Sequence, residues 1–521
     1  MVTVLHNARV VGYQALVKIT CDSETCRITS IEQQSRRSFA SSPWLRRPNG
    51  RDLTATVHIR RQTRDLVVID AGGSLVLPGL VHPRLHLSQA HFGGGPEDTL
   101  DGTELLFSSR GLAFLGPTTD IESLKRTEAV LKGTMPWHEE TKKVAALARI
   151  HSLVEAGRHI INSSLSHGVT SMRAQVDVDT VVGHLPLYAG SALQMEFAPQ
   201  CDVRLALFAS QPIYSQRDRG YLKEHTDRMM WFLQNAATRD GVRAIGSAPF
   251  MEGDHLAALR NIQYILDLAE AHGVDAEFKL DLDISQDGRL FNMLEEIHKR
   301  PAFLSDFRSP QPKHANFPLR VTIAHYGRFA NMSSLQKSNI AEAVAGWEIY
   351  FVGLPDEGQA FLRRPSPSRS GTPYRGAVEI GDTVPNNWAS GQNGSLVKDL
   401  DAHTSLALEN AGNPTTPWDT DPLVLLTMTA NISPHEPDDA WEAQAQSLLR
   451  MVTMNAAAAA GMGKRAHPQS LHLRPGDVAN LVILDGCFDC RTAVTSPPFG
   501  RITIKRGRLV AGAPVKGRNG H

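Results

Sequence analysis

Apolar and polar positions in the middle of the chain follow two patterns in turn. Short apolar runs are separated by stretches in which apolar residues recur at helical spacing, as at Leu259, Ile262, Leu266 and Ala269. This stretch ends at Gly273, where a left-handed helix cap is expected. Strands that alternate with amphipathic helices are typical of βαβ units and a parallel sheet. Eight strands are predicted, at 75–87, 169–178, 203–210, 242–249, 276–281, 319–325, 348–354 and 404–408.

Eight such strands predict a (β/α)8 barrel of the TIM type, although periodicity alone leaves a large open sheet as an alternative. The two ends of the chain instead alternate like antiparallel strands, at 2–10, 15–31, 479–484 and 501–510. Neither end can bury a face alone, so we expect both to meet in one small composite β-sandwich. The predicted fold class is α/β. We expect residues 1–70 and 466–521 to form the sandwich and residues 71–465 to form the barrel.

Two long segments carry neither pattern. Eight arginines crowd a Ser/Pro-containing insertion at about 33–65. A solvated basic loop is the simpler interpretation, and contact with an anion or a partner is the alternative. The second segment, 355–398, follows the predicted seventh strand and is rich in Gly, Ser, Asn and Pro. It would lie on the catalytic face of a barrel, where long loops often act as lids.

Charge and composition narrow the partners. The 521 residues include 54 Lys plus Arg and 54 Asp plus Glu, so no global field would recruit nucleic acid or an anionic membrane. A small, roughly neutral molecule is the expected partner, and a homo-oligomer stays open. The N-terminus lacks a signal-peptide pattern, and no apolar run approaches roughly 18 residues. We therefore expect a soluble, cytoplasmic protein.

The five cysteines do not suggest a disulfide framework, because their number is odd and the chain is long. Cys487 and Cys490 form a single CxxC. Metal binding there would need two more ligands, so two thiols on a surface hairpin are the simpler interpretation.

Several runs resemble a known family. The run DAGGSLVLPGLV at 70–81 is similar to the one that leads from the sandwich into the first barrel strand of amidohydrolases, the superfamily of metal-dependent hydrolases. The run RPGDVANLVILD at 474–485 resembles the one that leads back out. MRAQVDVD at 172–179 and the step from Pro417 to Trp418 resemble the cytosine deaminase branch. The resemblance covers nearly the whole chain and implies the same barrel and sandwich.

The resemblance also implies a zinc or iron site at the C-terminal ends of the strands. The family's ligands are an HxH pair, a histidine on each of strands five and six, and an aspartate on strand eight, and a carboxylate after strand five moves protons. His86 and His325 stand at ligand positions, but Arg84 and Lys279 replace two histidines. Leu282 stands at the carboxylate position, and Gly412 or Asn413 at that of the aspartate.

Two histidines are too few for a catalytic zinc site, which typically has three protein ligands. At an effective dielectric of about 20, each added cation would repel the dication by several kcal/mol at 4 to 5 Å. We therefore expect a degenerate site that binds far less than one equivalent of metal. Any metal that did bind would be held by His86 and His325.

Strand periodicity places His82, Arg84 and His86 on one face. A buried histidine with hydrogen-bond partners is the simpler interpretation of His82, and a deeper metal ligand is the alternative. We expect Arg84, His86, Lys279 and His325 to converge at the C-terminal mouth of the barrel.

Two classes of function follow. The preferred one is an amidohydrolase-like enzyme that acts on C–N bonds of a small nitrogen heterocycle, cyclic amide or amidine through an altered, metal-independent site, with Arg84 and Lys279 as an electrostatic clamp. The alternative is a catalytically inactive relative that binds a ligand or partner. Asp281 could also be a structural carboxylate paired with a barrel cation. The expected site comprises catalytic Lys279, Asp281 and His325, and substrate-binding Arg84, Gln175 and Trp418.

Overall fold

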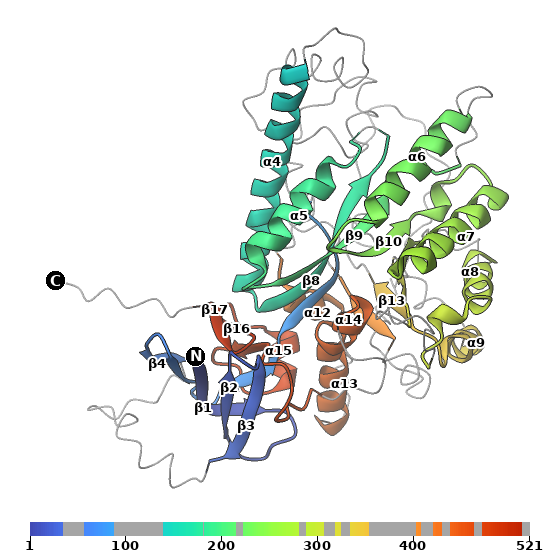
Figure 1. Cartoon of the computed structure of the whole chain (residues 1–521). Coiled ribbons are helices and arrows are strands. Elements are labelled where there is room, and N and C mark those ends of the chain that lie inside the picture. The colour runs from blue at the N-terminus through green and yellow to red at the C-terminus, as the bar shows by residue number, and fades with distance from the viewer. Residues whose placement is uncertain are drawn as a thin grey trace, which may run out of the picture.

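A computed structural model describes most of the chain as two joined units, a barrel and a smaller β-structure (Figure 1). No described helix combines the length and the apolar character needed to cross a bilayer. The described residues are 1–34, 57–87, 139–180, 182–214, 222–280, 288–306, 318–324, 334–353, 403–407, 420–429, 438–462 and 471–512.

The larger unit contains an eight-stranded sheet in which every neighbouring pair is parallel. Its strands follow one another in chain order, and the two outermost strands also approach each other, so the sheet curls into a nearly closed barrel. The predicted (β/α)8 barrel is confirmed. The strands are β7 (Leu80–His86), β8 (Val169–Val178), β9 (Asp202–Ala209), β10 (Val242–Ser247), β11 (Asp275–Lys279), β12 (Val321–Ala324), β13 (Ile349–Gly353) and β14 (Thr404–Leu406).

Helices cover the outside of this sheet, and α7 (His255–His272) shows how local sequence sets their limits. The Asp254 side chain accepts a hydrogen bond from the backbone N–H of Ala257, and Gly273 closes the helix at φ 64°. The cap expected at Gly273 is confirmed. The other helices are α4 (Glu139–Ser166), α5 (Leu185–Phe197), α6 (Leu222–Ala237), α8 (Gly288–His298), α9 (Ser334–Val344), α12 (Pro422–Thr429), α13 (Asp438–Met451), α14 (Met454–Ala459) and α15 (Cys490–Thr495).

The smaller unit is built from both ends of the chain, as predicted; in Figure 1 its blue N-terminal strands lie beside the red C-terminal ones. One long strand, β1, belongs to two sheets, because its first part pairs with β2 and β5 and its end pairs with β6. Apolar side chains from both sheets share one core. The strands are β1 (Val2–Val10), β2 (Val17–Asp22), β3 (Arg27–Gln33), β4 (His58–Gln62), β5 (Leu66–Asp70), β6 (Leu75–Pro78), β15 (Leu481–Leu484), β16 (Arg501–Lys505) and β17 (Arg508–Ala511).

Three predicted segments differ from the structure. The strand expected at 75–87 is two strands, of which β6 pairs with β15 in the sandwich and only β7 enters the barrel. They separate at Gly79, where a Cβ would overlap the side chain of Thr170. The stretch 15–31 is likewise divided, into β2 and β3. Part of the predicted Arg-rich loop is the strand β4, and its residues 35–56 lie outside the described part of the chain, as does the candidate lid at 355–398.

An irregularity in β7 changes which residues face the barrel interior. His82 pairs with Met172 and Leu85 pairs with Ala174, so β7 has one more residue than β8 between these pairs. Pro83 lies in this bulge, where a residue without an N–H is tolerated. The prediction that His82 shares a face with Arg84 and His86 is therefore wrong. His82 instead lies on the helix side, with its Nε2 atom 3.3 Å from Ser164 Oγ of α4.

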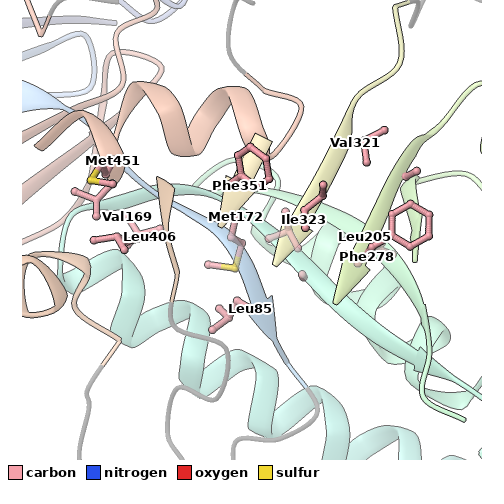
Figure 2. Close-up of a cluster of buried hydrophobic side chains, with 14 of the residues drawn as sticks. Leu85, Val169, Met172, Leu205, Phe278, Val321, Ile323, Phe351, Leu406 and Met451 are labelled. Atoms are coloured by element: carbon pink, nitrogen blue, oxygen red, sulfur yellow. The ribbon is translucent and has the colours of Figure 1, made fainter. Parts of the chain in front are cut away.

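On several barrel strands, such as β7 and β8, the two faces have opposite character. Side chains such as Leu85, Met172, Phe278 and Ile323 form the apolar core that Figure 2 shows. Alternate positions on the same strands, such as Arg173 between Met172 and Ala174, are polar and equally buried. Barrel interiors are more often filled by branched apolar residues. The buried polar side chains on these strands therefore distinguish this interior from a wholly apolar one.

Candidate active site

Arg84 and Glu277 form an ion pair across the barrel. Arg84 Nη1 lies 2.5 Å from Glu277 Oε1, and both side chains are 0% exposed. Their strands, β7 and β11, are four places apart in the sheet order, so the two side chains can meet only through the interior. The Arg84 guanidinium also lies over the ring of Phe208, 4.9 Å from its centre. The positive charge of Arg84 is therefore balanced by a buried carboxylate.

Gln175 joins this pair from the neighbouring strand β8. Its Nε2 atom donates a hydrogen bond to Glu277 Oε1. Two buried oxygens, Gln175 Oε1 and Glu277 Oε2, have no hydrogen-bond partner within the described part of the chain, and Arg173 Nη1 lies 3.8 Å from the latter. Leaving such an acceptor unmet costs about 1–3 kcal/mol. These oxygens can therefore accept hydrogen bonds from N–H groups of a ligand or from water.

His86 and Asp177 lie one step closer to the mouth of the barrel than Arg84 and Gln175, because each follows its neighbour by two residues. His86 Nδ1 is 3.8 Å from Asp177 Oδ1, and both side chains are buried. The edge of the His86 ring meets Phe208, with ring centres 6.3 Å apart at an angle of 83°. This level adds an imidazole and a carboxylate to the polar groups below it.

A deeper layer closes the interior toward the N-terminal face. Arg173 donates hydrogen bonds to Asp275 Oδ2 at 2.6 Å and to Thr322 Oγ1 at 2.9 Å. Arg320 Nε lies 3.6 Å from Glu348 Oε2. The Thr322 hydroxyl in turn donates to the carbonyl of Ala459, the last residue of α14. This layer joins β8, β11 and β12 to α14 and includes the residues just before β12 and β13, and we interpret it as the structural floor of the site.

The structure brings some of the predicted site residues together, and others lie outside the described part of the chain. Arg84, His86 and Gln175 lie together around Phe208 and Glu277. Lys279 is the last residue of β11, two positions after Glu277, and is partly exposed at the mouth. The other predicted or aligned positions, which are Asp281, Leu282, His325, Gly412, Asn413 and Trp418, lie outside the described residues.

Sequence analysis did not select Asp177, Phe208 or Glu277. The signal was present for two of them, because Asp177 follows Gln175 by two residues and Glu277 precedes Lys279 by two. Nothing in the sequence indicated that Phe208 lies under Arg84, since that contact depends on the curvature of the sheet.

The described residues do not fit the zinc or iron centre that the resemblance implies. Among them, no three His, Cys, Asp or Glu side chains come together as ligands could. Arg84 stands at a ligand position but can only donate hydrogen bonds, and its partner is Glu277.

The CxxC pair has a different setting from the one expected. Cys487 and Cys490 are buried, and Cys490 begins α15, so the expectation of thiols on a surface hairpin is wrong. Burial raises the pKa of Cys487 to about 11. All five cysteines are free thiols, and burial keeps this one in its protonated, unreactive form.

His82 gives a pH-dependent prediction. Burial lowers its pKa to about 4, so the unfolded chain takes up a proton that the folded protein excludes. The free energy of unfolding should fall by about 3 kcal/mol on this account as the pH falls from 6.5 to 4. Urea unfolding across this range should show a flatter pH dependence for His82→Gln. His255→Gln, on the exposed start of α7, should keep the wild-type slope; equal slopes for all three proteins would contradict the prediction.

Comparison with known proteins adds to this geometry. No protein-family model matches the sequence, and no curated protein sequence does. Solved structures match over the full length. The 5-methylcytosine deaminase of Klebsiella pneumoniae bound to phosphonocytosine has a TM-score of 0.62 and 20% identity, with 100% of each chain covered. The N-isopropylammelide isopropylaminohydrolase of Burkholderia multivorans ATCC 17616 has a TM-score of 0.59 and 17% identity, over 98% of this chain and 99% of that one.

A further amidohydrolase matches with a TM-score of 0.52 and 11% identity, over 98% of each chain. Identities this low establish the fold and not the chemistry. The strand order, the sandwich shared by both chain ends and these full-length matches agree. This chain therefore has the fold of the amidohydrolase superfamily.

Proposed function

We propose that this protein is an amidohydrolase-like hydrolase that acts on a C–N bond of a small nitrogen heterocycle or cyclic amide. The observation that carries the proposal is the pair of buried oxygens, Gln175 Oε1 and Glu277 Oε2, on side chains linked to Arg84, whose guanidinium lies over the ring of Phe208. A planar ring that carries amide or amino N–H groups could donate to such oxygens. Two structures of the same fold belong to enzymes whose names indicate such substrates, a 5-methylcytosine deaminase and an N-isopropylammelide isopropylaminohydrolase.

The proposed roles follow the levels of the barrel. Gln175 orients the substrate, with Trp418 as a second binding residue. Arg84 contributes a fixed positive charge, because Glu277 holds its guanidinium. Lys279 lies at the mouth, where a cation would stabilise negative charge that develops when water adds to the ring carbon. Asp281 and His325 are proposed to move the proton from that water to the departing amine.

A ligand-binding protein without turnover is the second candidate. It is favoured by the Arg84–Glu277 pair, which engages a position that the resemblance assigns to the reaction centre. The leucine at position 282, where the family has a proton-shuttling carboxylate, also favours this candidate. Such a protein would bind the same class of ring and release it unchanged.

The test uses the purified full-length chain with cytosine, 5-methylcytosine and cyclic amides, scored for released ammonia or amine and for binding by calorimetry. Turnover without added metal is expected. Gln175→Leu removes an acceptor and should weaken binding about 10-fold or more. The same change at Gln33→Leu, exposed on β3, should leave affinity unchanged. Binding without product would favour the second candidate, and neither binding nor product would contradict both.

A further inference from the structure

We infer that the Arg84 guanidinium, held across the barrel by Glu277, is a built-in cation that takes the place of a metal ion in this fold. The inference stands apart from the proposed reaction, because it concerns what fills the centre of the barrel. It starts from the position of the pair. β7 and β11 face each other across the barrel, and the pair joins residues near their C-terminal ends.

The surroundings of Glu277 explain why the pair is stable there. Glu277 Oε1 accepts hydrogen bonds from Arg84 Nη1, at 2.5 Å, and from the Gln175 amide. Arg173 Nη1 lies 3.8 Å from Glu277 Oε2. The Arg84, Arg173 and Glu277 side chains are all 0% exposed. A buried carboxylate needs a balancing cation, and here two guanidiniums provide it. A metal dication at the same place would have to displace the Arg84 and Arg173 guanidiniums or be repelled by them, because guanidiniums cannot lose their charge.

The backbone around Glu277 is fitted to this arrangement. Gly246 lies beside it on β10, and a Cβ there would overlap the carbonyl oxygen of Glu277. The two strands therefore approach more closely than a larger residue would allow. The Phe208 ring of β9 supports the guanidinium of Arg84. The backbone of Glu277 is thus packed closely against β10, and the guanidinium of Arg84 rests on a ring from β9.

The first test measures metal dependence in the unmodified protein. Purified full-length protein should contain far less than one equivalent of zinc or iron by elemental analysis. Its melting temperature should not change after dialysis against a chelator, nor on addition of zinc alone or iron(II) alone. A melting temperature that falls with the chelator and recovers with zinc, together with stoichiometric metal, would overturn the inference.

The second test is a double-mutant cycle. Arg84→Met and Glu277→Gln should each lower the melting temperature by roughly 3–5 °C, since each leaves a buried group without its opposite charge. The double variant should melt above the less stable single variant, because no buried charge is then left alone. Lys18→Met and Glu32→Gln separate a pair of the same type that is 34% and 57% exposed, and should show no coupling.

The outcomes separate this inference from the proposed function. If Arg84→Met does not fold, recovery of folded protein in the double variant still shows the coupling. Strictly additive changes in melting temperature would overturn the inference, whatever the activity. A chain that neither binds nor hydrolyses heterocycles would contradict the proposed function, while an uncoupled or metal-dependent barrel would contradict only this inference.

Discussion

Arg501→Met should lower the free energy of unfolding by about 3–5 kcal/mol, because it leaves a buried carboxylate without its cation. Arg501 on β16 of the sandwich donates to both oxygens of Asp421, at 2.7 and 2.5 Å. It also donates to the backbone oxygen of His167, just after α4. The Arg501 and Asp421 side chains are 1% and 7% exposed, so water cannot replace the lost bonds. Urea unfolding of the variant measures the change.

A matched control lies five residues away. Arg506 also joins the sandwich to the barrel, with its Nη2 atom 2.6 Å from Asp202 Oδ1, but its side chain is 47% exposed. Arg506→Met should therefore cost about 1 kcal/mol or less. Arg501→Met should also speed proteolysis between the two units, and Arg506→Met should not. Equal losses in the two variants would show that burial of the Arg501 pair contributes nothing.

Phe208→Ala should lower the free energy of unfolding by about 3–5 kcal/mol and should also abolish ligand binding. Phe208 is 1% exposed, the Arg84 guanidinium lies over its ring, and the His86 ring meets it edge-on. Removal of the ring leaves a cavity beside Arg84 and His86, which now pack against it. Urea unfolding gives the stability, and calorimetry at a temperature where the variant is folded gives the affinity.

Phe197→Ala is the comparison that separates the two effects. Phe197, at the end of α5, is 2% exposed and packs in the apolar core outside the barrel strands. Its loss should destabilise the protein to a similar degree while leaving ligand affinity unchanged. If both phenylalanine variants bind ligand equally well, the site does not include the Phe208 level of the barrel.

The sequence predicted the elements well because their signals are local. The strand expected at 169–178 is β8 itself, and the cap of α7 lies at Gly273 as expected. Local patterns could not show that the run 75–87 serves two sheets, since both parts are apolar and only the partner strands differ. They also missed the extra residue near Pro83, because strand periodicity assumes an unbroken ladder.

The site was predictable to a smaller extent. Resemblance to a family drew attention to Arg84 and Lys279, where the expected ligands are replaced. It could not indicate that Arg84 is paired with Glu277, because that contact depends on which strands face each other across a closed sheet. A sequence motif orders residues along the chain, whereas a barrel interior brings together strands far apart in it.

The shared sandwich also imposes an order on biosynthesis. β6 has β15 as a ladder neighbour, and Ser74 Oγ accepts a hydrogen bond from Gly486, 412 positions later. While the ribosome is still making the barrel, the edge of β6 that will pair with β15 exposes unpaired N–H and C=O groups. Such edges can pair with other chains, so we expect the nascent chain to be prone to aggregation until β15 emerges.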